Sequence, residues 1–355
     1  MTSPVEAADL RARVDKALAA FLAEQTSRLI GIDPALGAVA EALDDFVLGG
    51  GKRLRPAFAY WGYRGAGGAD CDHVVSAVSA LELVQASALI HDDLMDRSDT
   101  RRGLPSVHRR FEARHTAAGW RGGAAAFGDS AAVLLGDLAM VWSDEMLHTS
   151  GVGAIELIRA RPIFDEMRTE VTVGQYLDVL TQATADTSVE RAGKVARFKA
   201  AKYTVERPLL LGAALAGASV EVREAYSDFG LPLGEAFQLR DDVLGVFGDP
   251  AQTGKPAGDD LREGKRTYLV ASAFARLDEA GRAELDLGLG DQGLDDRGVA
   301  RLRALIRECG ALAATERRID ELMTASLATL KAARIEDDAR DVLRSLAEAS
   351  TRRTV

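Results

Sequence analysis

Hydrophobic positions recur with a helical period along most of this chain, and stretches that alternate apolar and polar residues like a strand are scarce. Ala and Leu dominate the periodic segments, and both favour helix. Helices are predicted over 11–30, 35–48, 56–65, 72–97, 129–147, 153–160, 163–183, 188–206, 208–217, 220–228, 232–247, 267–279 and 298–309, with more towards the C-terminus. Because the breaks between them are short, the pattern favours one compact helical bundle.

Glycine and proline mark the breaks between the predicted helices. Pro56 is expected in the first turn of its helix, where its missing N–H costs nothing. Loops are predicted at 99–105, 119–128 and 248–264, which are polar or rich in Gly. Residues 1–10 are predicted to be a flexible N-terminus and residues 11–350 to form one domain.

Charge excludes one broad class of function. The 355 residues carry a formal net charge of -10. Nonspecific nucleic-acid binding needs a basic face, so a nucleic-acid partner is not expected. If the substrate is an anion, local Lys and Arg side chains or metal ions must hold it.

Cysteine usage and hydropathy predict a cytoplasmic protein that is not inserted in a membrane. Cys71 and Cys309 lack CxxC spacing and are typical of a reducing compartment. Residues 1–10 carry acids and no apolar core of a signal peptide. The apolar stretch Ala131 to Trp142 is short and contains Asp137, so it is interpreted as a buried helix.

Two aspartate-rich clusters carry the strongest chemical signal. Asp92, Asp93 and Asp96 end one long apolar run, and Asp241 and Asp242 end another. Residues four apart share a helix face, and a helix C-terminus disfavours acids. Carboxylates gathered there cost stability unless a cation offsets them. The clusters therefore predict a cavity for hard cations such as Mg2+ with a phosphate ligand.

Basic residues near the clusters have two interpretations when each is taken alone. Gly49 to Gly51 followed by Lys52 and Arg55 could cradle an anion, or could be a loop with a solvated basic patch. Arg101 and Arg102 could bind substrate or simply neutralise the preceding carboxylates. Four lysines further along the chain are each interpreted as surface charge when taken alone: Lys199, Lys202, Lys255 and Lys265.

Two familiar motif types are rejected. Gly254-Lys255 is not a Walker motif, because the spacing to Gly248 is wrong and Pro256 stands where Ser or Thr is required. Three histidines lack metal-ligand spacing and are expected to be hydrogen-bonded structural residues: His91, His108 and His115.

The order and spacing of these elements together resemble the trans-isoprenyl diphosphate synthases, the polyprenyl synthetase family. The resemblance runs from about Gly49 to Tyr268. The matching stretches are Gly50 to Pro56, Asp92 to Asp96 with Arg101 to Gly103, Gly174-Gln175 with Asp178, Lys199, Gln238, Asp241-Asp242, and Gly254 to Lys265. The resemblance implies an all-α isoprenoid synthase fold around a central cavity.

The resemblance also implies roles for individual residues. Three Mg2+ ions are expected, with Asp92 and Asp96 holding two, Asp93 nearby, and Asp241, beside Asp242, holding the third. The allylic diphosphate would be bound by Arg101, Lys199 and Lys255, and the diphosphate of isopentenyl diphosphate by Lys52, Arg55, Gln85 and Arg102. Gln238 and Lys265 are further candidates to bind substrate, and the residues expected to be catalytic are Lys199, Gln238, Lys255, Asp92 and Asp241. A homodimer is expected.

The implied reaction is a head-to-tail condensation by metal-assisted ionisation, condensation and elimination. Its substrates would be isopentenyl diphosphate and dimethylallyl, geranyl or farnesyl diphosphate. Short-chain members close the product tunnel with aromatic residues four or five positions before the first cluster. Here those positions are Ala88 and Ser87, with Val84 one turn deeper. Geranylgeranyl diphosphate, C20, is predicted, with products of C25 or more, or farnesyl diphosphate, as alternatives.

The chain departs from the family pattern at two positions. Gly245 replaces the usual third Asp of the second cluster, and Ala200 follows Lys199 where many members have Thr. Lys202 and Thr204 are candidates to compensate for Ala200.

Two rival functions are disfavoured by the sequence. A terpene cyclase would not need the segment Gly50 to Pro56, which is present here. A non-catalytic regulatory subunit would lose an acidic cluster or that segment, and both are present.

Overall fold

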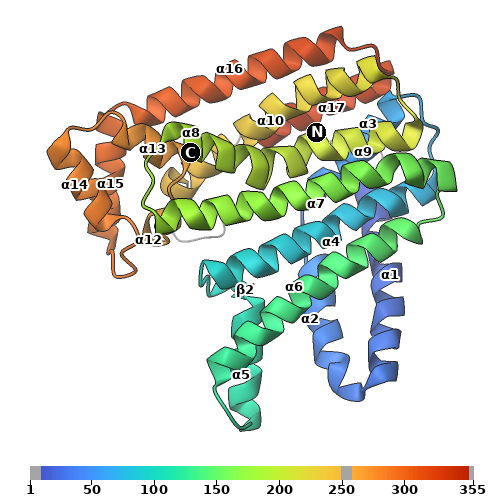
Figure 1. Ribbon diagram of the computed structural model, residues 1–355, viewed down its shortest axis with the longest axis horizontal. Coiled ribbons are helices and arrows are strands. Elements are labelled where there is room, and N and C mark those ends of the chain that lie inside the picture. The colour runs from blue at the N-terminus through green and yellow to red at the C-terminus, as the bar shows by residue number, and fades with distance from the viewer. Residues whose placement is uncertain (1–8, 249–257, 352–355) are drawn as a thin grey trace. The chain divides into compact units, whose positions relative to one another are not determined.

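The computed structural model describes residues 9–248 and 258–351. Nearly all regular structure in these ranges is helical (Figure 1). The strands within them are β1, Thr100–Arg101, and β2, Leu104–Pro105, which pair antiparallel. The prediction of an all-α protein is therefore confirmed.

The chain folds into two compact units, and the backbone passes between them several times. Unit 1 comprises the described residues of Met1–Phe164, Pro208–Ser219 and Ile335–Val342. Unit 2 comprises those of Asp165–Arg207, Val220–Arg334 and Leu343–Val355. The single domain over 11–350 stays a prediction. Of the expected flexible N-terminus, residues 1–8 lie outside the described residues, whereas Leu10 is buried as the first residue of a helix.

Unit 1 is built around one apolar helix. Its elements are α1 (Leu10–Ile32), η1 (Pro34–Leu36), α2 (Gly37–Leu48), α3 (Leu54–Gly65), α4 (Asp72–Met95), the two strands, α5 (Val107–Ala118) and α6 (Ala124–His148). Helix α4 packs on α1, α3 and α6. It is apolar on most sides, as expected for a helix surrounded by neighbours.

Within the described residues, two helices are long and apolar enough to cross a membrane by length and composition alone, α4 and α6. In α4 the apolar window is 72% buried inside the protein, which is the environment of a core helix. In α6 only 33% of the window is buried. The prediction of a buried helix over Ala131 to Trp142 is therefore met on one side of α6, while the other side exposes Val133, Leu134 and Val141.

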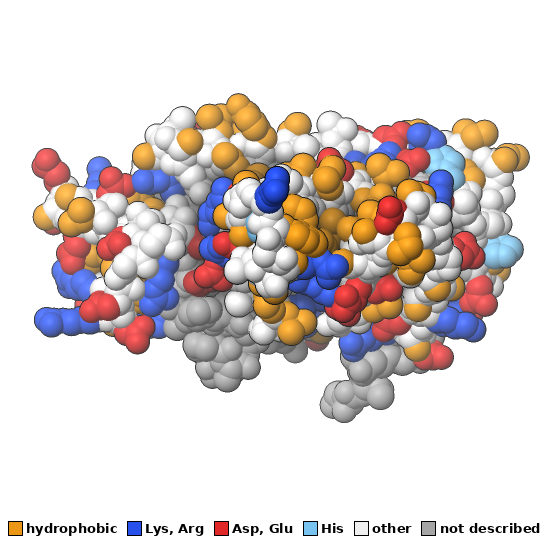
Figure 2. All heavy atoms as spheres, turned by 90° about the horizontal axis from the view of Figure 1, so that it is seen from below, with side chains coloured by type: hydrophobic (Ala, Val, Ile, Leu, Met, Phe, Trp, Pro, Cys, Tyr) orange, Lys and Arg blue, Asp and Glu red, His pale blue; other side chains and the backbone are white. Residues whose placement is uncertain are grey.

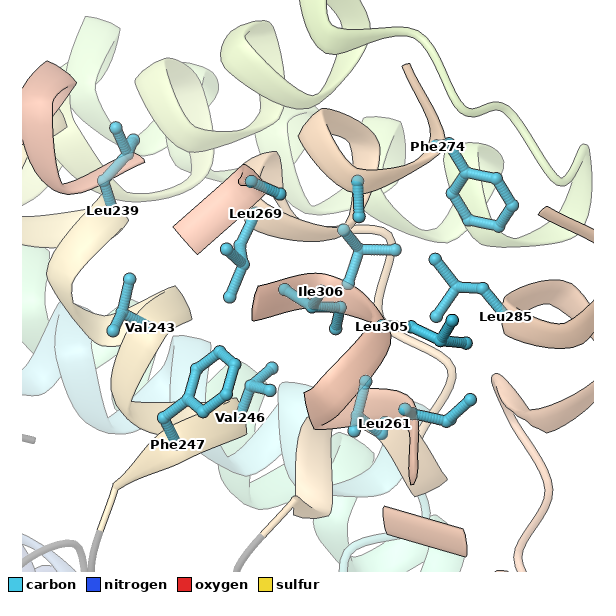
Figure 3. Packing of buried hydrophobic residues seen from close by; sticks show 14 of the residues in the cluster. Leu239, Val243, Val246, Phe247, Leu261, Leu269, Phe274, Leu285, Leu305 and Ile306 are labelled. Carbon is cyan, nitrogen blue, oxygen red and sulfur yellow. The ribbon is translucent and has the colours of Figure 1, made fainter. Parts of the chain in front are cut away.

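Unit 2 has its own apolar core. Its elements are α8 (Val189–Val195), the π-helix η2 (Ala196–Glu206), α10 (Val220–Phe247), α12 (Asp259–Arg262), α13 (Tyr268–Phe274), α14 (Glu279–Gly288), α15 (Asp296–Glu308) and α16 (Ala311–Ala332). Leu239, Val243 and Val246 form one stripe of α10 and belong to the same buried cluster as Leu269 and Ile306 (Figure 3). Burial of this stripe fixes which residues of α10 lie on its other sides.

Three helices contain residues of both units: α7 (Ala154–Ala183), α9 (Arg207–Ala216) and α17 (Asp337–Thr351). The breaks predicted in α7 near Pro162, and in α10 near Pro232, are wrong, because both helices continue through the proline. In α10 the buried side chains Phe229, Leu233 and Ala236 continue on both sides of Pro232. Tertiary burial therefore outweighs the lost backbone hydrogen bond.

The loop predicted over 119–128 is also partly wrong, since α6 begins at Ala124. Gly128 lies inside this helix, and a Cβ built on it would overlap the His108 carbonyl of α5. This glycine serves close helix packing and does not break the helix. Sequence patterning also missed α5 and α14, and the loop predicted over 99–105 contains the β1–β2 hairpin.

Glycines bring α3 and α9 into backbone contact within unit 1. A Cβ on Gly212 would overlap the Ala59 carbonyl oxygen, and a Cβ on Gly62 would lie 2.7 Å from the Leu209 carbonyl oxygen. Neither glycine has a positive φ, so space and not backbone conformation requires them. Gly62 and Gly212 therefore allow the backbones of α3 and α9 to approach each other closely.

Gly212→Ala is expected to destabilise the protein by about 1–3 kcal/mol, because the methyl group must push two helix backbones apart. Gly193→Ala is the matched control, since nothing lies within 4 Å of its Cβ position. There the helix propensity of Ala should add about 1 kcal/mol. Urea unfolding of both variants measures the difference, and equal stabilities would show that the close contact is unimportant.

Candidate active site

The first acidic cluster lies at the C-terminal end of α4, as predicted. Helix α4 ends at Met95, and Asp96 is its C-cap. Asp92 keeps 17% of its side chain exposed, whereas Asp93 keeps 1%. The cluster is thus divided between Asp92 and Asp96, which are partly accessible, and Asp93, which is buried.

Arg101 neutralises the buried member of this cluster. Its Nε and Nη2 donate to the two carboxylate oxygens of Asp93 at 2.7 and 2.6 Å, a bidentate pair. The Arg101 Nη2 atom lies 3.9 Å from Asp92. The interpretation of Arg101 as a neutralising residue is therefore met for Asp93, and its role towards a diphosphate stays a prediction.

A tight hairpin presents the next arginine. The two-residue turn joining β1 to β2 consists of Arg102 and Gly103, both with positive φ. Two positive φ angles are typical of the type I′ hairpin turn. The Arg102 guanidinium donates to the carbonyl of Gly50. The hairpin therefore joins the triglycine segment to the end of α4.

The triglycine segment is held by a buried arginine. Gly50 and Gly51 have positive φ, which explains glycine at both positions. Arg53 is 4% exposed and donates to Glu82 at 2.7 Å, to Asp15 at 2.8 Å and to the Val47 carbonyl. Lys52, its neighbour, remains exposed.

Positive charge accumulates where these segments meet. Desolvation lowers the pKa of Arg102, and the nearby guanidinium groups of Arg101 and Arg53 lower it further. Lys52 lies in the triglycine segment, and Arg55 lies in the first turn of α3, which follows it. Gln85 follows Glu82 on the face of α4 that holds Arg53. The structure thus brings Lys52 and Arg102, two residues predicted to bind isopentenyl diphosphate, into neighbouring loops.

Sequence reasoning missed the Arg53–Glu82 pair. The available signal was Glu82 itself, an isolated acid inside the apolar stretch of α4. A buried acid requires a partner, and the nearby arginines at 53 and 55 were candidates. Arg53 is not predicted to bind substrate itself. It holds the triglycine segment, which carries the predicted substrate-binding residue Lys52.

The second acidic cluster shows the same division as the first. Asp241 is partly exposed on α10, and Asp242 is 4% exposed. Gln238 donates to Asp242 at 2.8 Å, and the Tyr268 backbone N–H donates to it at 3.2 Å. The pKa of Asp242 is raised to about 7, mainly by burial. The neighbouring carboxylates Asp260 and Asp241 act in the same direction, and the hydrogen bonds from Gln238 and the Tyr268 N–H act against them.

Lys199 lies on the π-helix η2, an unusual element that is frequent at functional sites. Its ammonium donates to Asp178 of α7 at 2.6 Å. A Cβ on Gly174 would overlap the backbone of Lys199 and Phe198, so α7 and η2 touch there. Gly174 and Asp178, which belong to the family motifs, thus position Lys199, a predicted diphosphate-binding residue.

The remaining predicted lysines are also held by carboxylates. Lys202 binds Glu170 at 2.8 Å and Glu206 at 3.2 Å, and compensation for Ala200 stays a prediction. Lys265 binds Glu263 at 2.5 Å. Lys255, with Gly254 and Pro256, lies outside the described residues.

The predicted chain-length residues belong to α4. Ser87 is 1% exposed and Val84 is fully buried, while Ala88 is partly exposed one turn before Asp92. The histidines behave as expected: the ring nitrogens of His91, His108 and His115 bond to the Val133 carbonyl, the Ser106 hydroxyl and the Arg121 carbonyl.

The donor set suits a magnesium ion that arrives with a phosphate ligand. No group of three or more His, Cys, Asp or Glu side chains is arranged to hold a metal in the described ranges. Mg2+ usually takes one or two carboxylates and completes its shell with phosphate oxygens and water. The partly exposed Asp92 and Asp96 match that requirement in unit 1, and Asp241 matches it in unit 2.

The helical fold and the two acidic clusters define an isoprenoid synthase type of enzyme. The polyprenyl synthetase family matches residues 37–306, so the chain belongs to this family and is a prenyltransferase. A farnesyl diphosphate synthase of Mycobacterium bovis is 36% identical over 266 residues, 73% of this chain and 67% of that protein. A geranylfarnesyl diphosphate synthase of Aeropyrum pernix is 34% identical over 273 residues, 76% and 79% of the two chains.

A solved structure is similar over nearly the whole length. It is a geranylgeranyl pyrophosphate synthase of Corynebacterium glutamicum, complexed with isoprenyl diphosphate and magnesium. The two chains are 44% identical, with a TM-score of 0.94 and coverage of 97% of this chain and 99% of that one. The expected family and fold are therefore confirmed, and the roles of individual site residues stay predictions.

Arg53→Met is expected to cost about 3–5 kcal/mol of folding free energy, because it leaves Glu82 buried without its charge partner. Arg28→Met is the matched control: Arg28 pairs with Glu145 at 3.0 Å but keeps 65% of its side chain exposed. The control should lose about 1 kcal/mol or less. Chemical denaturation measures both, and a small loss for Arg53→Met would contradict the anchoring role.

Proposed function

We propose that this prenyltransferase makes geranylgeranyl diphosphate from isopentenyl diphosphate and an allylic diphosphate, with Mg2+ as its metal. The observation that carries the proposal is the set of small side chains before Asp92, at Ser87 and Ala88. The similar structure from Corynebacterium glutamicum bears the name of a geranylgeranyl pyrophosphate synthase and supports the same product.

Two groups of residues would bind the two diphosphates. The exposed Lys52, together with Arg55, Gln85 and Arg102, would bind isopentenyl diphosphate, and the excess positive charge around Arg102 supports an anion there. The allylic diphosphate would be bound by Arg101, Lys199, Lys255 and Lys265. For Arg101 and Lys199 this requires their carboxylate partners to share them with substrate, as charge-assisted donors can.

The chemistry is ionisation, condensation and elimination. Bound Mg2+ would offset the charge of the diphosphate and stabilise it as the leaving group. Asp92, Asp96 and Asp241 would hold the metal, while Gln238 keeps the neighbouring Asp242 in place. Apolar side chains around the allylic tail would exclude water from the cationic carbon. The carbon–carbon bond forms as the isopentenyl double bond attacks, and the released diphosphate would accept the lost proton.

Product length would be set by the side chains of α4 that precede Asp92. Each helical turn adds about 5.4 Å of depth to a tail that follows the helix. Ser87 and Ala88 leave space where an aromatic ring would close the path, and Val84 lies one turn deeper. Chains of C25 or more, or farnesyl diphosphate, remain the alternatives, and relatives of this chain carry the names of both kinds of synthase.

We propose a homodimer on the apolar face of α6. Val133, Leu134 and Val141 are 45%, 64% and 61% exposed, and all three lie on the solvent side of that helix. Ile155 and Ile158 at the start of α7 are exposed as well. Apolar side chains are visible between charged ones across the surface in Figure 2. An exposed apolar helix face of this kind is typical of a protein interface.

We also propose that the protein works in the cytoplasm. Cys71 and Cys309 are free thiols. Free thiols at partly exposed positions suit a reducing compartment.

Asp92→Ala and Asp241→Ala are expected to lower kcat about a hundredfold or more, which is roughly 3 kcal/mol of transition-state stabilisation. Glu284→Ala is the charge-matched control, because Glu284 forms an ion pair with Arg301 on the surface of unit 2 and has no predicted role in catalysis. Steady-state assays with Mg2+, and with a chelator, measure the effect. Near-normal turnover of Asp92→Ala would overturn the metal assignment.

Ser87→Phe combined with Ala88→Phe is expected to shift the main product from C20 to C15, because two rings cannot fit a path lined by small side chains without blocking it. The single variant Ser87→Ala is the control: it keeps the side chain at 87 small and should still give C20. Chromatography of the dephosphorylated products measures the length. A wild type that stops at C15, or a double variant that still reaches C20, contradicts this account.

Leu134→Glu combined with Val141→Glu is expected to convert the dimer to a monomer, since two charges would have to be desolvated in the interface. Sedimentation velocity measures the mass. Both side chains already face solvent in the isolated chain, so the fold should survive, and circular dichroism checks this. A wild-type monomer, or a double variant that remains dimeric, would rule out this face as the interface.

A further inference from the structure

Gly245 lies inside α10, one turn after Asp241, and its backbone does not require glycine. Its φ is not positive, and glycine in a helix interior costs about 1 kcal/mol relative to Ala. A Cβ built on Gly245 would overlap the carboxylate of Asp260, with both carboxylate oxygens and Cγ close to it. The carboxylate of Asp260 therefore occupies the space in which a side chain at 245 would begin.

The same carboxylate lies near the second acidic cluster. Residues 241 and 245 share a face of α10, so the position filled by Asp260 is on the Asp241 side of the helix. Asp260 is also one of the two carboxylates whose charge acts on Asp242, together with Asp241. Three acids thus gather around one turn of α10, although the helix itself supplies only two.

We propose that Asp260 supplies the third carboxylate of the second cluster, and that Gly245 is the residue that makes room for it. Asp260 would act on the metal held by Asp241, directly or through a water of its coordination shell. Mg2+ keeps several waters, and carboxylates that bind those waters orient the ion. The inference rests on the proposed magnesium-dependent function and deepens it.

A purely structural role for Asp260 is the competing explanation. The Lys265 ammonium lies 3.9 Å from Asp260 and 2.5 Å from Glu263. Only 15% of the Asp260 side chain is exposed. A buried carboxylate is either paired within the protein or bound to a metal, so experiments must separate these two roles.

The test measures metal binding and not turnover. Full-length protein is titrated with Mn2+ in the presence of inorganic pyrophosphate, and unbound Mn2+ is counted by electron paramagnetic resonance. Asp260→Asn should weaken one class of bound Mn2+ about 10- to 100-fold, the range found when outer-shell partners of a metal are removed. Asp259→Asn, the same change one residue earlier in α12, should leave the titration unchanged.

Moving the carboxylate to the helix separates a metal role from a structural one. Asp260→Ala removes the obstruction, so Gly245→Asp combined with Asp260→Ala should recover most of the affinity that Asp260→Ala loses. Gly245→Ala alone should weaken Mn2+ binding about as much as Asp260→Asn, because its methyl group displaces the carboxylate.

The outcomes distinguish this inference from the proposed function. If Asp241→Asn removes Mn2+ but Asp260→Asn does not, the role of Asp260 is refuted and the metal-dependent function stands. Failure of the relocated carboxylate to restore binding refutes it too. If the wild type binds no Mn2+ with pyrophosphate, the proposed metal dependence itself is refuted.

Discussion

The cost of placing two adjacent carboxylates on one helix shapes both acidic clusters, at the end of α4 in unit 1 and inside α10 in unit 2. In each Asp-Asp pair the second acid is buried and satisfied by the protein: Arg101 binds Asp93, and Gln238 with the Tyr268 N–H binds Asp242. The first acid of each pair keeps access to solvent. The buried member fixes the geometry, and the accessible member is left for an external cation.

Glycines allow close contacts beside several of the charged side chains of the candidate site. Gly174 lets α7 touch η2 beside Lys199, and Gly245 leaves room for the Asp260 carboxylate beside α10. In unit 1, Gly50 and Gly51 shape the loop that Arg53 anchors and that Arg102 meets. Substituting any of these glycines would therefore alter charged groups as well as packing.

The sequence was sufficient for the fold class, the family and the position of the first cluster at a helix end, because these follow from periodicity and motif order. It was insufficient where tertiary burial decides. Pro162 and Pro232 do not end their helices, and Gly128 is a packing residue inside α6. The Arg53–Glu82 pair and the Asp260 carboxylate near α10 join residues distant in sequence, so no local pattern could predict them.

The division of labour within the Asp pairs is tested most directly by thermal unfolding of Asp92→Ala and Asp93→Ala, each with and without Mg2+ and pyrophosphate. Asp93→Ala should lower the Tm of the free protein, because Arg101 loses its buried partner at a cost of about 1–3 kcal/mol. Asp92→Ala should keep the wild-type Tm but lose the stabilisation by ligand. The reverse pattern, or equal effects of the two substitutions, would contradict the account.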